Sequence, residues 1–345
     1  MAARGIATAP AGELGQPLLD GRLRITRATD EPADPLRGPF HVDRDRILAT
    51  KAFRRLGAKT QVFIAPEGDH YRTRLTHTLA VAAISRTAAR ALGLDEDLAE
   101  AIALGHDLGH TPFGHTGEAA LNAVSEQHLG RPFRHNEHSL RIVDLLARDG
   151  RGLNLTDAVR DGILTHTGPR LPATLEGRIV RIADRFAYVN HDIDDAIRAG
   201  LLVPADLPAA LVAVLGDSGA ARIDLLVADL VAASSESGDI CQSPEVAEAF
   251  AELRGFMFER VYLGEVNDRD RARVEEFLPR MVDTLLADPS RLPGAPHRAA
   301  DTPAAVAQAV IDHVAGMTDR YCLRLMRELF LPREWRLDER LLGIG

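Results

Sequence analysis

The 345-residue sequence has little cysteine, few aromatic residues and no long apolar run. Its only cysteines, Cys241 and Cys322, are too far apart to form a Cys-x-x-Cys pair, so neither a disulfide framework nor a zinc–cysteine site is expected. No segment approaches the ~20 apolar residues that a membrane helix needs, and no signal-peptide core follows Arg4. We therefore expect a cytoplasmic protein without a membrane partner.

Basic charge is also scarce, since 41 Lys and Arg residues face 50 Asp and Glu residues and give a net charge of −9. This balance argues against a surface built for nucleic acid, although a local basic pocket would still accept phosphate groups. Hydrophobic residues make up 46% of the chain, which is enough to bury a large core. The composition favours a globular protein with a small anionic ligand, and nucleic acid is not indicated as a partner.

Helix signals run along most of the chain, and strand signals are almost absent. Apolar residues recur three and four positions apart from Ile47 to Leu56, and glycines such as Gly93 and Gly130 follow the periodic runs as helix stops. The pattern predicts an all-α fold with a long helix over 175–199 and further helices over about 217–236, 243–262, 269–287 and 302–330.

Changes in this pattern predict three regions. Residues 1–40 lack periodicity and are expected to form a mobile N-terminal arm. Residues 41–200 are expected to form the catalytic core. Residues 201–345 are expected to add a C-terminal helical layer that completes the pocket and supplies oligomer contacts.

Histidine is unusually concentrated. Most of the thirteen histidines fall between His70 and His138, and the adjacent pair His106-Asp107 follows an apolar helical segment, AEAIALG. A buried carboxylate costs several kcal/mol unless a cation or hydrogen bonds compensate it. For this pair alone, a metal ion and a hydrogen-bonded helix end are equally good explanations.

Two further residues extend the pair to a candidate ligand set. His77 lies in the apolar helix RTRLTHTLAVA, where a lone histidine is usually a core residue, and Asp184 lies on the buried stripe of RIVRIADRF. Two imidazoles and two carboxylates suit Mn, Fe, Zn, Ni, Co or Mg and leave coordination positions for water and phosphate oxygen. The set predicts one divalent metal ion without deciding which.

Longer strings around these residues resemble a known family. The segments DHYRTRLTHT, GHDLGHTPFGHTGEAALN, FRHNEHSLRI and DRFAYVNHDIDDAIRAG are similar to those of the HD-domain deoxynucleoside triphosphate triphosphohydrolases, also described as deoxyguanosine-triphosphatase-like proteins. The resemblance runs from about Asp43 to Tyr262. It implies an HD-domain helical core and hydrolysis of a dNTP by water attack at the α-phosphorus, which releases a deoxynucleoside and tripolyphosphate.

The resemblance also implies a proton-transfer pair. His115 and Glu118 are three residues apart at the start of a predicted helix, so their side chains lie on the same side. In such enzymes His115 would exchange a proton with the 5′ oxygen or the attacking water, and Glu118 would fix its tautomer and raise its basicity. Without the family, Glu118 would be interpreted as a first-turn helix charge favoured by the helix dipole.

Substrate contacts are implied in the same way. Asp184, Tyr188 and Asp192 are spaced by four residues and share one helix face. The family implies contacts of Asp192 and Gln61 with the 3′-hydroxyl, of Arg185, Arg74 and Arg260 with phosphates, of His110 and His135 along the phosphate channel, and of Val62 with the sugar, where it would exclude a 2′-hydroxyl. Additional Mg bound with the triphosphate, a dNTP activator and a homo-oligomer (tetramer or hexamer) are further implications.

Two alternatives remain open. A different HD phosphohydrolase, acting on nucleotide monophosphates, cyclic dinucleotides or alarmones, would need only the metal ligands. A non-catalytic nucleotide-sensing or nucleic-acid-binding module would need neither His115 nor Glu118. The presence of both residues together with the segments around Gln61 and Tyr188 favours the triphosphohydrolase.

Overall fold

The computed structural model describes residues 25–61, 72–262, 265–293 and 302–331, and within these the prediction of an all-α fold is confirmed. The β pairing in the described ranges is limited to two isolated bridges, Arg27 with Thr156 and Thr60 with Thr73. None of the helices in these ranges is long and apolar enough to span a lipid bilayer. The α-helices are α2 (Pro39–Leu48), α3 (Lys51–Arg55), α4 (Arg74–Ala91), α5 (Glu96–Gly105), α6 (Gly114–Leu129), α7 (His135–Arg141), α8 (Ala147–Gly150), α9 (Asp157–Thr165), α10 (Leu175–Arg198), α11 (Ala209–Leu215), α12 (Gly219–Ser237), α13 (Pro244–Met257), α14 (Glu265–Ala287), α15 (Pro303–Ala315) and α16 (Asp319–Phe330).

Side-chain caps fix the starts of three helices, α4, α5 and α10, that carry or precede the predicted metal ligands. Thr73 and Thr76 form a capping box at the start of α4, Asp95 accepts from two backbone N–H groups at the start of α5, and Thr174 accepts from Gly177 N at the start of α10. Such caps satisfy backbone donors that the first helical turn leaves free. They therefore set where α4, α5 and α10 begin, and with that which side chains each helix turns inward.

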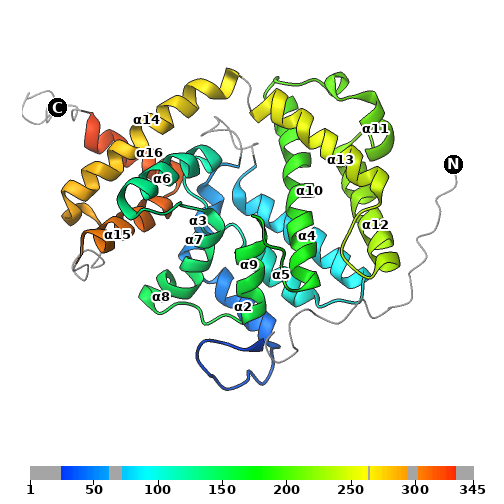
Figure 1. Cartoon of the computed structure of the whole chain (residues 1–345), viewed down its shortest axis with the longest axis horizontal. Coiled ribbons are helices and arrows are strands. Elements are labelled where there is room, and N and C mark those ends of the chain that lie inside the picture. The colour runs from blue at the N-terminus through cyan, green and yellow to red at the C-terminus, as the bar shows by residue number, and fades with distance from the viewer. Residues whose placement is uncertain (1–24, 62–71, 263–264, 294–301, 332–345) are drawn as a thin grey trace, which may run out of the picture.

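The buried apolar side chains form three clusters, and the groups of helices that carry them lie side by side along the molecule (Figure 1). The central cluster joins α2, α4, α5, α9 and α10 through residues such as Ile47, Ile102 and Ile163, which are fully buried. The second packs α10 against α11, α12 and α13, and the third packs α6 against α14, α15 and α16. Helix α10 belongs to both the central and the second cluster, so it joins the core to one flanking layer.

Part of the predicted N-terminal arm falls within the described residues. Asn154 exchanges two hydrogen bonds with the backbone of Thr29, at 3.0 and 2.8 Å, and Arg27 pairs with the buried carboxylate of Asp43. Helix α2 begins at Pro39. Residues 1–24 lie outside the described ranges, and the division of the chain at residues 40 and 200 stays a prediction.

Candidate active site

The four residues predicted as metal ligands come together from three segments. His77 lies inside α4, His106 and Asp107 directly follow α5, and Asp184 lies inside α10. The Nε2 atom of His77 is 2.9 Å from Asp184 Oδ1 and 4.0 Å from Asp107 Oδ2. The Nε2 atom of His106 is 3.4 Å from Asp107 Oδ1 and 3.7 Å from Asp184 Oδ1. Atoms that share one divalent ion lie about 3 to 4 Å apart, so the spacing is compatible with such an ion.

The hydrogen bonds of His106 leave one ring nitrogen for a cation. Its Nδ1 atom is 2.6 Å from the carbonyl oxygen of Ala103, which can only accept, so Nδ1 carries the proton. Its Nε2 atom then presents a lone pair, and this buried atom has no hydrogen-bond partner among the described residues. A buried acceptor that faces two carboxylates is the arrangement that a bound cation stabilises. His77, His106, Asp107 and Asp184 could therefore hold a metal ion.

The lowered pKa values of Asp107 and Asp184 also suit metal binding. Burial opposes the ionisation of Asp107, but the positive charge around it, including that of the hydrogen-bonded Arg74, outweighs burial and holds the pKa of Asp107 well below its ordinary value. Burial also acts against ionised Asp184, whereas the hydrogen bond to His77 lowers the pKa of Asp184 to about 2. Both residues are thus anionic at neutral pH, as metal ligands must be.

Arg74 brings a positive charge to the same place. Its guanidinium is almost fully buried at the start of α4 and donates from Nη1 to Asp107 Oδ2 at 3.0 Å. Its Nε and Nη2 atoms are buried without a hydrogen-bond partner in the described ranges. A buried guanidinium with free donors favours an anionic ligand that can accept in a bidentate way, such as a phosphate.

The contacts of Glu118 differ from those predicted. Glu118 was expected to fix the tautomer of His115, but in the structure its carboxylate accepts from the Nδ1 of His135 at 2.9 Å and from the backbone N–H of His135 at 2.8 Å. Residue 135 is the first of α7, whose N-terminus points at Glu118, so a backbone and a side-chain donor reach the carboxylate together. His115 still lies in the same cluster, with a ring nitrogen within 4.8 Å of Glu118 and His110 ligand atoms.

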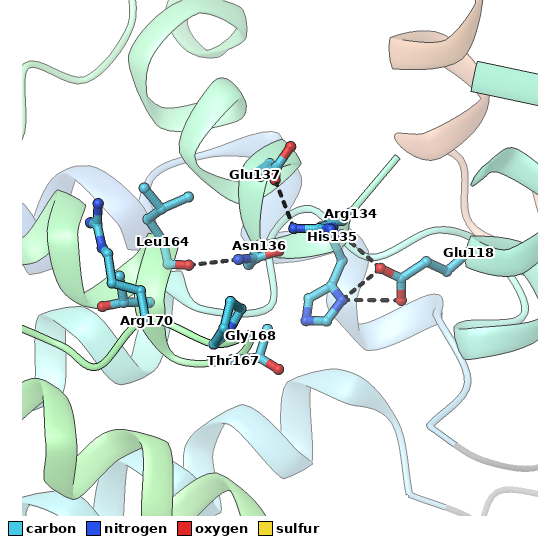
Figure 2. Close-up of a pocket in the computed structure, with 11 residues that line it drawn as sticks. Glu118, Arg134, His135, Asn136, Glu137, Leu164, Thr167, Gly168 and Arg170 are labelled. Carbon is cyan, nitrogen blue, oxygen red and sulfur yellow. Dashed lines mark hydrogen bonds and ion pairs between the residues drawn. The ribbon is translucent and has the colours of Figure 1, made fainter. Parts of the chain in front are cut away.

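The Glu118–His135 pair lines an open cavity of about 510 Å³ (Figure 2). Figure 2 shows the His135 ring between the Glu118 carboxylate on one side and Thr167 and Gly168 on the other. Within the described ranges, Glu118 and His135 are the only predicted site residues that line it. The cavity therefore gives solvent access to this pair rather than to the candidate metal ligands.

Two further imidazoles, those of His110 and His166, connect this pair to the candidate metal ligands. The ring of His110 stacks on that of His135 at 4.0 Å between centroids, and its Nε2 atom is 3.4 Å from Asp107 Oδ1. The Nε2 atom of His135 is 3.1 Å from that of His166, which in turn lies edge-on to His106 at 5.0 Å. His166 was not predicted, because it stands alone after α9 without a neighbouring charged residue to mark it.

His135 differs from His110 and His166 in its protonation state at neutral pH. Burial would lower the pKa of His135, but its hydrogen bond to Glu118 raises that pKa above the ordinary value. Burial and the nearby Arg74 charge lower the pKa of His110 well below the ordinary value, and burial lowers the pKa of His166 to about 3. His135 is therefore the cationic member of the group, hydrogen-bonded on one side to a carboxylate and on the other to a neutral imidazole.

His115 has the accessibility of a proton-transfer group. It is the second residue of α6 and is exposed to solvent, with its ring edge-on to His110 at 5.6 Å. Desolvation by the surrounding side chains and the positive charge of Arg74 lower the pKa of His115. The neutral form that results at pH 7 can accept a proton.

A second buried group lies further along α10. Asp192 is buried two turns beyond Asp184, its Oδ1 atom has no hydrogen-bond partner in the described ranges, and its Oδ2 atom accepts from the hydroxyl of Tyr262. Burial raises the pKa of Asp192 to about 7. Gln61 is likewise buried, and its Oε1 atom has no hydrogen-bond partner among the described residues. Tyr262 was not predicted, because it reaches Asp192 from the π-helical turn η4 (Phe258–Tyr262), seventy residues later.

The structure gives few contacts for the other four residues that were predicted to bind the substrate. Tyr188 and Arg185 are half-buried on α10, and Arg185 makes no hydrogen bond or ion pair with the described residues. Arg260 is exposed on η4, where no contact with the other predicted residues is found within the described ranges. Val62 lies outside the described residues. The roles predicted for these four residues stay predictions.

Comparison with known proteins shows which family the chain resembles along most of its length. Residues 74–189 match the model of the HD domain, and residues 240–328 match that of the phosphohydrolase-associated domain. A deoxyguanosinetriphosphate triphosphohydrolase-like protein of Caldanaerobacter subterraneus subsp. tengcongensis is 51% identical over 309 residues, which cover 90% of each chain. A protein of the same description from Clostridium perfringens (strain 13 / Type A) is 45% identical over 322 residues, or 91% of each chain.

The chain belongs to this family of triphosphohydrolase-like proteins. The predicted resemblance and the HD-type helical core are thereby confirmed, and membership supports a hydrolase. A crystal structure of a hypothetical protein from Aquifex aeolicus is also similar, with a TM-score of 0.46 and 19% identity over 89% of this chain and 73% of that one. HD domains bind divalent metals, which agrees with the His and Asp cluster described above.

Proposed function

We propose that the protein hydrolyses deoxynucleoside triphosphates to a deoxynucleoside and tripolyphosphate. The observation that carries the proposal is the grouping of His77, His106 and Asp107 with Asp184, next to a buried arginine with free donors and a carboxylate–imidazole pair. The names of the relatives give the substrate class. In this reaction a bond forms between a water oxygen and the α-phosphorus, the bond from phosphorus to the 5′ oxygen breaks, and one proton of the water ends on the 5′ oxygen.

His77, His106, Asp107 and Asp184 would hold the metal ion. A divalent ion there would supply Lewis-acid polarisation of the α-phosphoryl group. Arg74 binds Asp107 through one nitrogen and keeps its other donors free for phosphate oxygens. The identity of the metal, among Mn, Fe, Zn, Ni, Co and Mg, and additional Mg bound with the triphosphate are left to experiment.

In this proposal His115 transfers the proton and His135 stabilises negative charge. Neutral, accessible His115 accepts the proton of the attacking water or returns it to the 5′ oxygen. His135, kept cationic by Glu118 and stacked on His110, offsets negative charge that builds up on the phosphates. Glu118 thus acts through His135, which differs from its predicted action on His115.

The buried polar atoms of Gln61 and Asp192 are proposed to bind the sugar. Each has an oxygen without a hydrogen-bond partner in the part of the chain that the structure describes, and a hydroxyl such as the 3′-hydroxyl would donate to it. Tyr262 orients the Asp192 carboxyl by donating to its other oxygen. Contacts of Arg185, Tyr188 and Arg260 with the substrate, and the exclusion of a 2′-hydroxyl by Val62, remain part of the proposal. So do a homo-oligomer, a dNTP activator and a cytoplasmic location.

Product analysis tests the proposal. Metal-loaded protein is incubated with each dNTP, alone and in mixtures, and with GTP as the ribose control, and the products are separated by anion exchange. The proposal expects deoxynucleoside and tripolyphosphate from wild type and none from Asp107→Asn. Orthophosphate or pyrophosphate as product would instead indicate a different HD phosphohydrolase. No turnover in any mixture would indicate a nucleotide-binding module.

A further inference from the structure

One carboxylate of the C-terminal layer holds two segments of the active site at once. Asp319, in the first turn of α16, is almost fully buried. Its Oδ1 atom accepts from the backbone N–H of Phe113 at 3.0 Å. Its Oδ2 atom accepts from the backbone N–H and the hydroxyl of Thr60, at 3.0 and 2.5 Å. Three hydrogen bonds to one carboxylate therefore join segments that are more than fifty residues apart.

The Phe113 contact falls at a strained position. Phe113 is the N-cap of α6 and has a φ of 63°, a left-handed conformation that bulky side chains rarely adopt. Such a conformation persists only where the surroundings fix it. The C-terminal layer fixes it twice, through Asp319 at the N–H and through Phe277, whose ring lies edge-on to that of Phe113 at 5.6 Å. The residues that follow this turn are Gly114 and His115, so its geometry sets the direction of the proposed proton-transfer residue.

The Thr60 contact reaches a second segment that carries predicted site residues. Gln61 follows Thr60 in the chain, and the N–H of Arg74 donates to the carbonyl oxygen of Lys59 at 3.1 Å. The buried Lys59 ammonium donates both to His110 O and, at 3.0 Å, to Ala315 O at the end of α15. A Cβ at Gly114 would lie 3.1 Å from Gln61 O, so the two segments are in near contact.

We propose that Asp319 is a positioning residue for the reaction. It fixes the turn that carries His115 and Glu118 relative to residues 59–61, which include Gln61 and accept a hydrogen bond from the N–H of Arg74. This inference rests on the proposed function, but the hydrogen bonds of Asp319 within the described ranges go to Thr60 and Phe113 and not to a candidate metal ligand. The C-terminal layer thereby takes part in building the site, which the HD core does not complete alone.

Asp319→Asn tests this role at almost constant volume. The substitution keeps one acceptor oxygen and replaces the other by an NH₂ group, so the N–H of either Phe113 or Thr60 faces a donor. We expect kcat to fall about tenfold to a hundredfold, because small displacements of reacting groups have effects of that size. The control is Cys322→Ala, which truncates a fully buried side chain on the same helix, whose hydrogen bond among the described residues is to Met281 and not to either segment. A kcat for Asp319→Asn within about twofold of wild type, or an equal loss in Cys322→Ala, would overturn the proposal.

Hydrogen exchange provides a readout that does not need activity. Residues 107–118 should exchange faster in Asp319→Asn than in wild type, and at the wild-type rate in Cys322→Ala. If the wild-type protein turns over no dNTP, the proposed function fails, while unchanged exchange in Asp319→Asn refutes the positioning role independently. If Asp319→Asn cannot be purified, Thr60→Val replaces it. This substitution removes one hydrogen bond to Asp319 and should lower kcat/KM about threefold to tenfold, and an unchanged value would refute the proposal.

Discussion

Glu118 accepts two hydrogen bonds from a single residue, His135, one from its ring Nδ1 at 2.9 Å and one from its backbone N–H at 2.8 Å. The double contact keeps both partners charged. Burial opposes the ionisation of Glu118, but the contact with His135 lowers the pKa of Glu118 to about 2, and the same contact raises the pKa of His135. A fixed imidazolium thus lies against His110 at the edge of the open cavity.

Glu118→Gln should lower the pKa of His135, because the neutral amide no longer stabilises the imidazolium. The pH profile of kcat/KM should rise with the deprotonation of His115, below pH 6.5, and fall with that of His135, above it. In Glu118→Gln the alkaline limb should move to lower pH, with a loss of about tenfold or more at pH 8. Glu137→Gln is the matched control, since Glu137 lines the same cavity but is exposed and, among the described residues, pairs with Arg134 and not with a histidine. An alkaline limb that stays in place would argue against the Glu118–His135 pair.

His115→Ala should lower kcat about a hundredfold to ten-thousandfold, the range expected when a proton-transfer group is removed. Metal content should be unchanged, since His115 is not among the candidate ligands. Steady-state kinetics and metal analysis of the same preparation check both statements. A rate within a few fold of wild type would show that the proton moves by another route.

Metal binding should stabilise the fold through His106 and its neighbours. Adding Mn²⁺ at about a hundred times its dissociation constant should raise the free energy of unfolding by about 2.7 kcal/mol, and a chelator should reverse the gain. His106→Ala should abolish the shift, whereas His128→Ala should retain it, because His128 pairs with Asp283 away from the site. Thermal unfolding with and without metal measures the difference. An equal metal-dependent shift in His106→Ala would place the ion elsewhere.

Asp192→Asn should stabilise the protein most above pH 7 and about a third as much at pH 5. The folded-state pKa of Asp192 is raised to about 7 by burial, so the folded protein binds a proton that the unfolded chain releases near pH 4. Stability is therefore lost as the pH rises through this window, by up to roughly 4 kcal/mol, and the neutral amide removes the loss. Denaturant unfolding at pH 5 and pH 8 tests this sign. A substitution that destabilises equally at both pH values would contradict it.

Tyr262→Phe removes the hydroxyl that donates to Asp192 and leaves the ring in place. We expect KM to rise about fivefold, the equivalent of one hydrogen bond of about 1 kcal/mol, with a smaller change in kcat. Kinetics with dATP and dGTP measure the split between the two constants. A pure loss of kcat would mean that Tyr262 acts on the chemical step instead.

Features that depend on local sequence patterns were predicted most reliably from the sequence. Periodic apolar residues predicted the helices, and His106-Asp107 at a helix end stood out because charged groups there need partners. Contacts between distant segments could not be predicted in this way. Glu118 pairs with His135 rather than with His115 because the turn before α7 brings a new N-terminus to the carboxylate.

The C-terminal region shows the same limit. The stretch 302–330 has continuous helical periodicity, yet it forms two helices, α15 and α16, separated by Gly316–Thr318, with the Thr318 side chain capping the second. This break places Asp319 in a first helical turn, where it reaches Phe113 and Thr60. Likewise, Tyr262 reaches Asp192 only because η4 folds back on α10. Such contacts depend on helix packing, which one sequence does not specify.

Hydrolysis of a dNTP in H₂¹⁸O tests the central claim most directly. Attack of water at the α-phosphorus places one ¹⁸O atom in tripolyphosphate and none in the deoxynucleoside, which mass spectrometry of the separated products distinguishes. We predict this labelling for wild type and no products for Asp107→Asn. Label in orthophosphate, in pyrophosphate or in the deoxynucleoside would show that a different bond is broken and would contradict the proposed function.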